Sequence, residues 1–341
     1  MLPVVSVVVP ARNEEKVIEN CIKSLLKVNY PKDRLEIVIA TDKNNTDRTI
    51  EVCKKYEPRI KIILTKETHC KAEALNYALP KLKGEIIAFY DADCIVEKNC
   101  IMNAVKRFED EKVMSVMGFI KPYNINQNII SKLVSLETCM VFFQDYLLSK
   151  FGYNVNLVGR NMFIRKKVFE KIHGFDEYSY LEDVEFSAEL RKYNFKTVLE
   201  KNAVTHDECP NSISDVLNQG LRFFRGLIRI KRKETFEDFV HGFNVYLNSI
   251  SSFMLFILLI NLFIKISFIN FLALAVIIFH FLFVSIANYV FKQPMKNLIL
   301  FPIFLLFFYM NFYIIAKAWY YERTNKPMKW YRTKRTGVVT K

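Results

Sequence analysis

Apolar and polar residues follow two different rhythms over the first 120 residues of the chain. The run "VVSVVVP" at Val4–Pro10 is continuous and β-branched, which is typical of a strand covered on both faces. The next stretch, "EEKVIENCIKSLLK", has apolar residues at the spacing of one helix face. Strand-like and helix-like segments keep alternating until "EIIAFY" at 85–90, which runs into "DADC". This β-α-β pattern predicts a doubly wound, mostly parallel α/β sheet, and such sheets bind ligands at the carboxyl ends of their strands.

The pattern changes twice further along the chain. Between 121 and 210 it is less regular, with a long helix expected from about Asn128 to Lys150. A basic amphipathic segment follows, and then three apolar segments of about 20 residues each, which is the length that crosses a bilayer. Buried core helices are the competing interpretation, but three such segments in one block favour a membrane. We therefore expect an α/β domain over 1–210, amphipathic interface helices over 211–244, transmembrane helices over 245–321 and a basic tail over 322–341.

Charge and cysteine content narrow the functional class. The net charge of +14 is compatible with nucleic acid, an anionic membrane surface or a phosphorylated substrate. The basic residues cluster beside the apolar segments and in the tail, which argues against nucleic acid. Seven cysteines without a CxxC pair indicate reduced thiols, and the first residues do not resemble a signal peptide. We expect an integral cell-membrane protein whose α/β domain is cytosolic.

Two carboxylates directly follow a predicted strand. Asp91 and Asp93 are two residues apart, so on an extended backbone their side chains point the same way. Such a pair suits a hard cation, Mg²⁺ or Mn²⁺, which would neutralise a diphosphate. A solvated turn is the competing interpretation of this short motif taken alone.

Further charged residues follow other strands and begin helices. Asp42, and less clearly Asp47, could accept hydrogen bonds from a nucleotide base or ribose, although Asp47 could equally cap a helix. Lys71 begins a helix near the same sheet edge and could meet a phosphate. Glu182 and Asp183 open another helix, where acids often only complement the helix dipole, but where one of them could be a general base.

These features, in their order and spacing, are similar to those of a known family. The chain resembles the family 2 glycosyltransferases, which have the GT-A nucleotide-sugar-binding fold. It looks most like their membrane-bound branch, which includes the cellulose, hyaluronan and chitin synthases and ceramide glucosyltransferase. The resemblance spans about residues 3–235. The matching segments are "VPARNEE" (9–15), "TDKNNTD" (41–47), "KAEALN" (71–76), "DAD" (91–93), "GRN" (159–161), "GFDEYSYLEDVEFS" (174–187) and "QGLRF" (219–223).

The resemblance implies roles for individual residues. Asp42 would contact the uracil or ribose of a UDP-sugar. Asp91 would lie near the uridine, and Asp93, together with Asp91, would bind the metal on the diphosphate. Asp183, flanked by Glu182, would be the catalytic base. The expected donor-binding residues are Pro10, Asn13, Glu14, Asp42, Lys71 and Asp91. The residues expected beside the diphosphate and acceptor are Gln219, Arg222, Phe223, Gly159, Arg160 and Asn161.

The chain departs from the family pattern at two places. The segment Lys43–Asn45 stands where many members have Gly and Ser. Phe223 stands where the QxxRW motif has Trp, and Phe can stack on a sugar but lacks the indole N–H donor.

Sugar transfer makes three chemical demands, which the expected site meets. The leaving diphosphate must be stabilised, the acceptor hydroxyl must lose a proton, and the acceptor must lie in line with the anomeric carbon. A single displacement inverts the anomeric centre. A base is needed for a hydroxyl acceptor but not for a polyprenyl phosphate, so the acid at Asp183 favours a hydroxyl.

The apolar segments bear on the acceptor. Three helices hardly enclose a polysaccharide channel, so we expect transfer of one or a few sugars to a lipid or lipid-linked glycan. The alternatives are a processive polysaccharide synthase that oligomerises to form its pore, or a polyprenyl-phosphate glycosyltransferase.

Membrane topology raises a conflict, because three spans would place the basic tail opposite the catalytic domain. The positive-inside rule places the tail in the cytosol. One apolar segment is therefore expected to be re-entrant or interfacial, or 298–320 bends at Asn311 and returns.

In the segment "NQGLRFFRG", Gln219, Arg222 and Phe223 share one helix face and are expected to face the site. Arg225, Arg229 and 231–233 are expected to face lipid phosphates.

Overall fold

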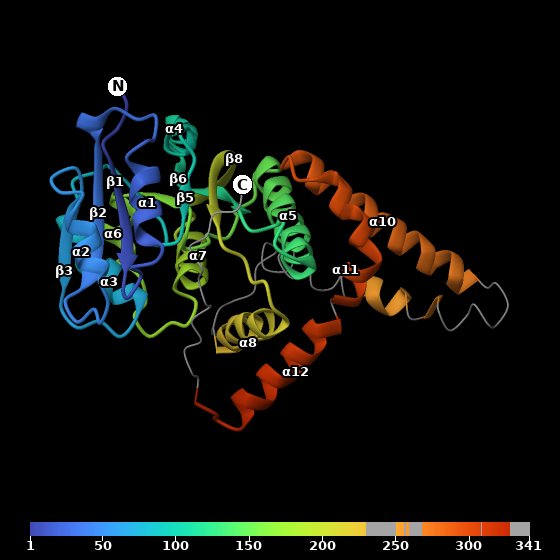
Figure 1. Cartoon of the computed structure of the whole chain (residues 1–341). Coiled ribbons are helices and arrows are strands. Elements are labelled where there is room, and N and C mark those ends of the chain that lie inside the picture. Colours follow the sequence, from blue (N-terminus) through green and yellow to red (C-terminus); the bar gives the residue numbers. More distant parts are fainter. Residues whose placement is uncertain (230–249, 256, 259–267, 308, 328–341) are drawn as a thin grey trace. The chain divides into compact units, whose positions relative to one another are not determined.

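The structure is a computed structural model that describes residues 1–229, 250–255, 257–258, 268–307 and 309–327 (Figure 1). The described chain forms two compact units. The first contains 1–124 and 148–208, and the second contains 125–147 together with the described residues after 208. The basic residues 231–233, most of the predicted span at 245–268 and the tail beyond 327 lie outside the described residues. The domain boundaries expected from the sequence therefore stay a prediction.

One mixed sheet organises the first unit. Among the described residues it has eight strands in the order β3-β2-β1-β4-β7-β6-β8-β5. The strands are β1 (Val5–Ala11), β2 (Leu35–Asp42), β3 (Lys61–Thr65), β4 (Ile86–Phe89), β5 (Ile95–Val96), β6 (Val113–Pro122), β7 (Met162–Arg165) and β8 (Lys196–Asp207).

The first four strands confirm the predicted β-α-β alternation. They pair in parallel, and helices α1 (Ile18–Leu25), α2 (Thr49–Lys54) and α3 (Lys71–Ala78) connect or follow them. The valines of β1 are fully buried, as the continuous β-branched run predicts. The chain adds β2 and β3 on one side of β1 and β4 on the other. The carboxyl ends of β1 and β4 therefore flank a topological switch point, where sheets of this class bind ligands.

The second half of the sheet is less regular. Strand β7 runs antiparallel to both β4 and β6, whereas β8 runs parallel to β6 with a register shift after Gly118. The two-residue strand β5 pairs antiparallel with β8. The helices in this part are α4 (Cys100–Lys106), α6 (Lys167–Ile172) and α7 (Glu182–Lys192), with the short 3-10 turn η3 (Arg107–Glu109). Two other 3-10 turns, η1 (Lys32–Arg34) and η2 (Leu79–Lys81), precede β2 and β4 in the first half.

The second unit is helical. Its elements are α5 (Ile129–Lys150, of which 129–147 belong to this unit), α8 (Ile213–Arg229), α10 (Phe268–Val290), the 3-10 turn η4 (Met295–Leu300), α11 (Phe301–Phe307) and α12 (Tyr309–Arg323). Leu133, Leu136 and Met140 of α5 pack with Val284 of α10 and with the phenylalanines of α11. In the described part of the chain, two stretches are long and apolar enough to cross a bilayer, at Asn270–Val290 and Met295–Arg323. The second comprises η4, α11 and α12, so it is not one uninterrupted α-helix.

Candidate functional site

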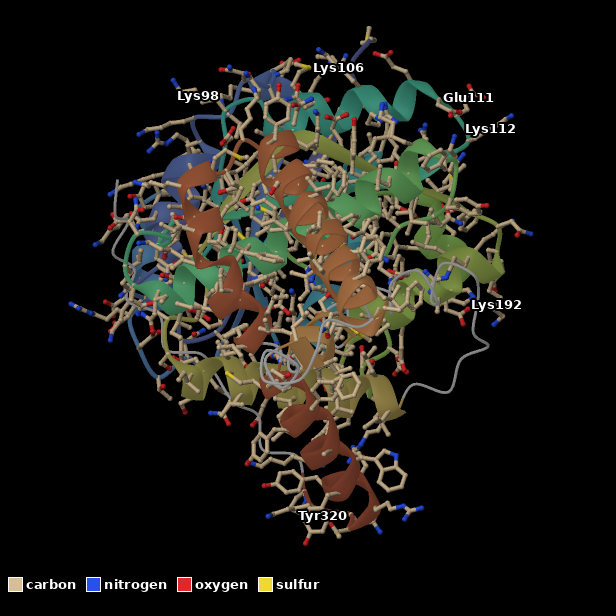
Figure 2. All side chains as sticks on the ribbon, turned by 90° about the vertical axis from the view of Figure 1, so that its right-hand side faces the viewer. Lys98, Lys106, Glu111, Lys112, Lys192 and Tyr320 are labelled. Carbon is tan, nitrogen blue, oxygen red and sulfur yellow. The ribbon has the colours of Figure 1, made fainter. Side chains whose placement is uncertain are left out.

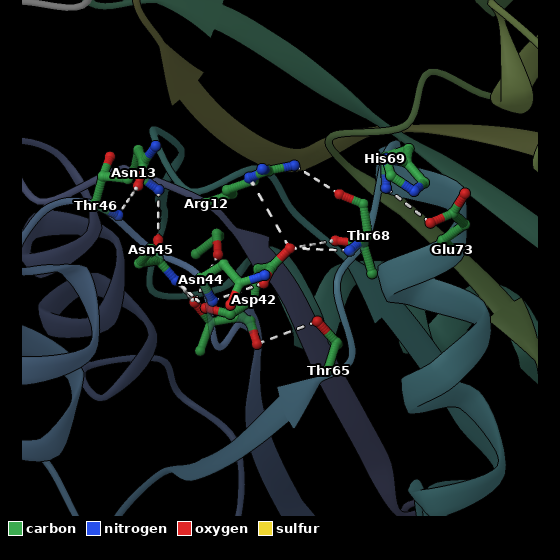
Figure 3. Close-up of polar contacts among 12 residues, drawn as sticks. Arg12, Asn13, Asp42, Asn44, Asn45, Thr46, Thr65, Thr68, His69 and Glu73 are labelled. Carbon is green, nitrogen blue, oxygen red and sulfur yellow. Dashed lines mark hydrogen bonds and ion pairs between the residues drawn. The ribbon is translucent and has the colours of Figure 1, made fainter.

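The first group of predicted site residues lies where β1 and β2 end (Figure 3). Asp42, at the end of β2, is 1% exposed and accepts hydrogen bonds from the Thr68 amide at 2.9 Å and the Asn44 amide at 2.7 Å. The Arg12 guanidinium lies 4.0 Å from the same carboxylate and donates to the Thr68 carbonyl. Burial raises the pKa of Asp42, but the hydrogen bonds from Thr68 and Asn44 and the nearby Arg12 bring that pKa below its ordinary value. Asp42 is therefore held as an ionised acceptor.

The unusual segment Lys43–Asn45 has a structural explanation. The Asn45 side chain accepts a hydrogen bond from the Asn13 amide at 2.6 Å, and its Nδ2 donates to the Thr41 hydroxyl. Asn13 has a φ of 57°, a left-handed conformation that asparagine adopts more readily than most residues, and its Oδ1 accepts from the Thr46 amide. These reciprocal bonds tie the β1 end to the β2 end (Figure 3). An asparagine here replaces a more flexible small residue with a side chain that fixes the loop.

Three other residues from the first motifs bond to other parts of the protein or lie within a strand. Asp47 Oδ1 accepts from the Thr49 amide at 2.9 Å, at the first residue of α2, although Arg48 and not Asp47 holds the N-cap position. Its Oδ2 accepts from the Glu15 amide. The Glu14 amide donates to the Thr49 hydroxyl at 2.7 Å. Pro10 lies within β1, in register with Ala40. Donor contacts by Pro10, Asn13 and Glu14 stay predictions.

A second group surrounds Lys71 at the start of α3. Its ammonium lies 2.5 Å from Asp91 Oδ1, donates to the Gly159 carbonyl at 2.8 Å and lies 3.8 Å from a Glu182 oxygen. Burial lowers the pKa of Lys71, but Asp91 and Glu182 more than offset it, so that the pKa is raised. The structure therefore brings together residues from α3, the end of β4, the 159–161 loop and α7, which are far apart in the sequence. The phosphate contact expected for Lys71 stays a prediction, since in the structure its partners are carboxylates and a carbonyl.

Asp183 lies at the edge of this group. Its Oδ2 accepts a hydrogen bond from the Gly159 amide at 2.8 Å, and its Oδ1 accepts from the Val184 amide at 2.9 Å. A Cβ added to Gly159 would lie 3.1 Å from Lys71 Nζ and 3.4 Å from Asp183 Oδ2, so this glycine lets the backbone pass between the two charges. Burial, and then the charge of Asp183, raise the pKa of Glu182 above its ordinary value. The two adjacent acids thus differ: Asp183 binds two amides, whereas Glu182 lies beside Lys71.

The Asp91–Asp93 pair fits the cation expected from the sequence. Asp91 is the partner of Lys71, and Asp93 is 8% exposed at the same strand end. Among the described residues, no group of three or more His, Cys, Asp or Glu could hold a metal ion. Oxygen-only donors that supply one or two carboxylates suit Mg²⁺ or Mn²⁺ when substrate phosphates and water complete the coordination. The donor set therefore fits a cation that arrives with a diphosphate.

Arg160 and Asn161 of the "GRN" motif have different partners. Arg160 pairs with the buried Asp207 at the end of β8, and its carbonyl accepts from the Cys94 thiol. Asn161 is fully buried, and its Nδ2 donates to the carbonyls of Phe119 at 3.0 Å and Ala203 at 2.9 Å. Its amide therefore joins β6 to the chain of β8. Substrate contacts by Gly159, Arg160 and Asn161 stay predictions, but Asn161 has a clear structural role.

Asn161→Ala is therefore expected to lower the free energy of unfolding by about 3 kcal/mol, since two buried carbonyls lose their donor. Urea unfolding of the purified protein measures this. Asn103→Ala is the matched control. Its Nδ2 donates to a single backbone carbonyl, that of Asn202, and this bond is at the surface. Unchanged stability with a raised KM for the donor would instead make Asn161 a substrate contact.

The last predicted group, Gln219, Arg222 and Phe223, lies on α8 in the second unit. Phe223 is 42% exposed. Their proximity to Asp183 and the diphosphate stays a prediction. The structure corrects the expectation for the neighbouring arginines: Arg225 is 3% exposed and forms an ion pair with Glu322 at 2.5 Å, and Arg229 pairs with the same carboxylate. The predicted lipid-facing role is therefore wrong for Arg225. Its partner Glu322 is 97 residues away in the sequence, so helical spacing within α8 could not indicate this ion pair.

The structure also identifies a residue that the sequence argument passed over. Asn76, the last residue of "KAEALN", accepts from the Phe175 amide at 2.9 Å and donates to the Phe175 carbonyl and to Glu177. Gly174 has a φ of +100°, and a Cβ there would lie 2.5 Å from Asn76 Oδ1. Asn76 thus fixes the loop that leads to Glu182 and Asp183. The sequence contained one indication of this role: both "KAEALN" and "GFDEYSY" belong to segments that resemble the family.

A family comparison agrees with this geometry. Residues 6–173 match the model described as "Glycosyl transferase family 2". The mannosyltransferase PcManGT from Pyrobaculum calidifontis, determined in complex with GDP-Man and Mn²⁺, superimposes with a TM-score of 0.62 at 20% identity over 96% of this chain and 89% of that chain. This likeness shows a shared fold, and the GT-A architecture predicted from the sequence is confirmed.

Curated relatives extend the comparison. The probable glycosyltransferase YdaM of Bacillus subtilis is 28% identical over 369 residues, which cover 98% of this chain and 87% of that protein. A beta-monoglucosyldiacylglycerol synthase of Nostoc is 32% identical over 196 residues, or 55% of this chain and only 41% of that protein. A Methanococcus voltae enzyme that glycosylates dolichyl N-acetyl-alpha-D-glucosaminyl phosphate is 26% identical over 64% of this chain and 71% of that protein.

Proposed function

We propose that this chain, a glycosyltransferase whose residues 6–173 form a family 2 domain, transfers a sugar from a UDP-sugar to a hydroxyl of a lipid or lipid-linked glycan at the cytosolic membrane face. The observation that carries the proposal is the position of Asp183. Its carboxylate is oriented by two backbone amides and lies one residue from the Glu182–Lys71–Asp91 chain of charges. A base is thereby held beside the group that would receive the diphosphate.

Each residue of the site has a distinct task in the proposed reaction. Asp42, ionised and fixed by Thr68 and Asn44, accepts hydrogen bonds from the nucleoside. Asp91 and Asp93 would hold a divalent cation, which when bound supplies charge neutralisation to the leaving diphosphate. Asp183 accepts the proton of the acceptor hydroxyl as that oxygen attacks the anomeric carbon, and the bond from carbon to UDP breaks. One displacement inverts the configuration at that carbon.

Two observations support a lipid-borne acceptor. The second unit contains the apolar stretches Asn270–Val290 and Met295–Arg323, which are long enough to cross a bilayer. The relatives from Nostoc and Methanococcus are named for a glycosyldiacylglycerol product and a dolichyl-phosphate-linked substrate. The hydroxyl is favoured over a polyprenyl phosphate because a phosphate acceptor is already ionised and leaves Asp183 without a task.

The test is a donor and acceptor screen with the full chain in proteoliposomes. UDP-glucose, UDP-N-acetylglucosamine, UDP-galactose and GDP-mannose are each paired with diacylglycerol, an undecaprenyl-linked disaccharide or undecaprenyl phosphate, and mass spectrometry identifies the glycolipid. We expect a UDP-sugar with diacylglycerol or a lipid-linked glycan to give product of inverted anomeric configuration. Turnover only with undecaprenyl phosphate would replace the proposal with the polyprenyl-phosphate activity, and long polymers would replace it with a processive synthase.

Metal dependence gives a separate prediction. Chelation with EDTA is expected to abolish UDP-sugar turnover, and Mn²⁺ or Mg²⁺ to restore it. Asp93→Asn is expected to lower kcat/KM by roughly 100-fold or more, since a missing electrostatic partner of the leaving group costs about that much. Isothermal titration of Mn²⁺ in the presence of UDP supplies a readout independent of turnover. Asp47→Asn is the control, because Asp47 binds backbone amides, and an equal loss of Mn²⁺ binding in both variants would contradict the assignment.

A further inference from the structure

Helix α12 differs from α10 in the side chains that it exposes. On α10 the exposed large residues are mostly Phe, Leu and Ile, as in a helix that faces lipid tails. On α12 they are mainly aromatic and partly polar: Tyr309, Phe312, Tyr313, Trp319 and Tyr320. Tyr320 projects outward near the tip of this helix in Figure 2 and is 60% exposed. Although both stretches are apolar enough to span a bilayer, their surfaces indicate different surroundings.

Cationic side chains lie over two of these rings and over the ring of Tyr321. The Lys317 ammonium lies 5.0 Å from the Tyr313 ring centroid, and the Arg323 guanidinium lies 4.0 Å from that of Trp319. Lys326, just after the helix, lies 4.4 Å from the Tyr321 ring centroid. Trp, Tyr and basic residues together are enriched where a protein meets lipid headgroups, since each has an apolar body and a polar end. Lys317 lies six residues before the end of the apolar stretch Met295–Arg323, so the cationic residues gather in the last part of that stretch.

Packing against α8 provides a second, independent observation. In the middle of α8, Gly220 approaches Ile314 so closely that an added Cβ would lie 3.0 Å from Ile314 Cδ1. Further along, Arg225 binds Glu322 and the Lys326 carbonyl, each at 2.5 Å. The residues Ile314 and Glu322 are about 12 Å apart along a helix. The two helices therefore lie side by side over this length.

The charges of α8 determine the depth of both helices. Asp215, Arg222, Arg225 and Arg229 lie on α8, and charged side chains at the centre of a bilayer are costly. Glu322 is the shared partner of Arg225 and Arg229, so α12 cannot move into hydrocarbon without breaking these ion pairs or taking α8 with it. The Ile314–Glu322 part of α12 is therefore fixed to a charged helix, and the cost of burying those charges opposes its movement into hydrocarbon.

We propose that α12 lies with α8 in the headgroup layer of an anionic bilayer, with its aromatic and cationic face on the lipid, and does not cross the membrane. The proposal rests on the membrane location in the proposed function. It assigns Lys317, Arg323 and Lys326 to lipid phosphates, the role that the sequence had suggested for Arg225. It also leaves the end of α12 on the same side of the membrane as α8, which removes the conflict between three spans and the basic tail.

Depth measurement on two labelled sites tests the proposal. Tyr313→Cys and Tyr320→Cys are made separately in a Cys70→Ser background, because the other six native cysteines are buried. Both tyrosines are exposed, at 54% and 60%, and they are seven residues apart, so they lie on nearly the same helix face. The full chain carries a nitroxide label in vesicles of phosphatidylcholine and phosphatidylglycerol, and electron paramagnetic resonance reads depth from oxygen and nickel-chelate accessibility.

We expect both labels at headgroup depth, with little difference between them. A spanning helix would separate their depths by about 10 Å, the rise over seven residues. Phe271→Cys and Ile278→Cys on α10 are the matched pair, also exposed and seven residues apart, and should show that separation. A difference for α12 equal to that for α10 would overturn the proposal, and so would two labels in bulk water. These depths do not depend on turnover, so a failed donor screen and a failed depth measurement are distinguishable.

Lipid charge provides the last comparison. Removing phosphatidylglycerol, or introducing Lys317→Gln with Arg323→Gln, is expected to shift the Tyr320→Cys label toward water. Depths that are independent of both changes would show that aromatic burial alone holds α12, and would overturn the assignment of the cations to lipid phosphates.

Discussion

Asp183→Asn is expected to abolish sugar transfer while leaving UDP binding intact. Asparagine has the same shape as aspartate and keeps one side-chain oxygen to accept a backbone amide, so the start of α7 should stay in place. It cannot accept the proton of an attacking hydroxyl. General-base catalysis contributes about 10²- to 10⁴-fold, which sets the expected loss in kcat. UDP release measures the rate, and isothermal titration measures the affinity for UDP.

Glu182→Gln is the control for this prediction, since Glu182 is the adjacent residue on the same helix. Its carboxylate is 16% exposed and faces Lys71, not the two amides that hold Asp183. Its loss should weaken turnover only through the position of Lys71, with a smaller fall in kcat than Asp183→Asn. If Glu182→Gln were inactive and Asp183→Asn active, the two roles would have to be exchanged.

The sequence predicted the first half of the sheet better than the second half. Strands β1 to β4 and their helices each have a local apolar rhythm, so β-branched runs and helical spacing were sufficient. The reversed direction of β7 and the parallel pairing of β6 with β8 depend on contacts between residues such as Val116 and Val198, 82 positions apart. No local pattern encodes such pairings.

The same distinction applies to the site. Motif order located Asp42, Lys71, Asp91 and Asp183 because each follows a strand or begins a helix, and the sheet brings such positions to one edge. Motifs did not reveal which of their side chains bind the backbone. Asn161 is buried between strands, and Arg225 pairs with Glu322, although both belong to segments that suggest ligand contacts.

A chemical consequence follows for Lys71, whose charge is the centre of the site. It is the cation nearest to Asp91 and Glu182 and also donates to the Gly159 carbonyl, whose own amide holds Asp183. In Lys71→Met these carboxylates lose their counter-charge, and the Gly159 loop loses a bond. The Lys71 and Asp91 side chains are 22% and 32% exposed, so the pair is only partly buried. We expect a loss of about 2 kcal/mol in the free energy of unfolding, between the values typical of exposed and of buried ion pairs. Transfer should fall with it, because the base and the metal-binding carboxylate both move.

The Lys71→Met loss should also depend on pH in a defined direction. The pKa of Glu182 is raised in the fold by burial and by Asp183, and Lys71 opposes that rise. A carboxyl whose folded pKa exceeds its unfolded value favours folding at low pH and loses that contribution as pH rises through the folded value. Without Lys71 the folded pKa rises further, so the variant should lose stability relative to the parent as pH increases from about 4 to 8. Urea unfolding across that range measures the difference.

Lys66→Met, at an exposed lysine five residues earlier, is the matched control and should leave both stability and its pH dependence unchanged. A pH-independent difference for Lys71→Met would mean that its contribution is packing along the methylene chain and that the charge does not organise the site.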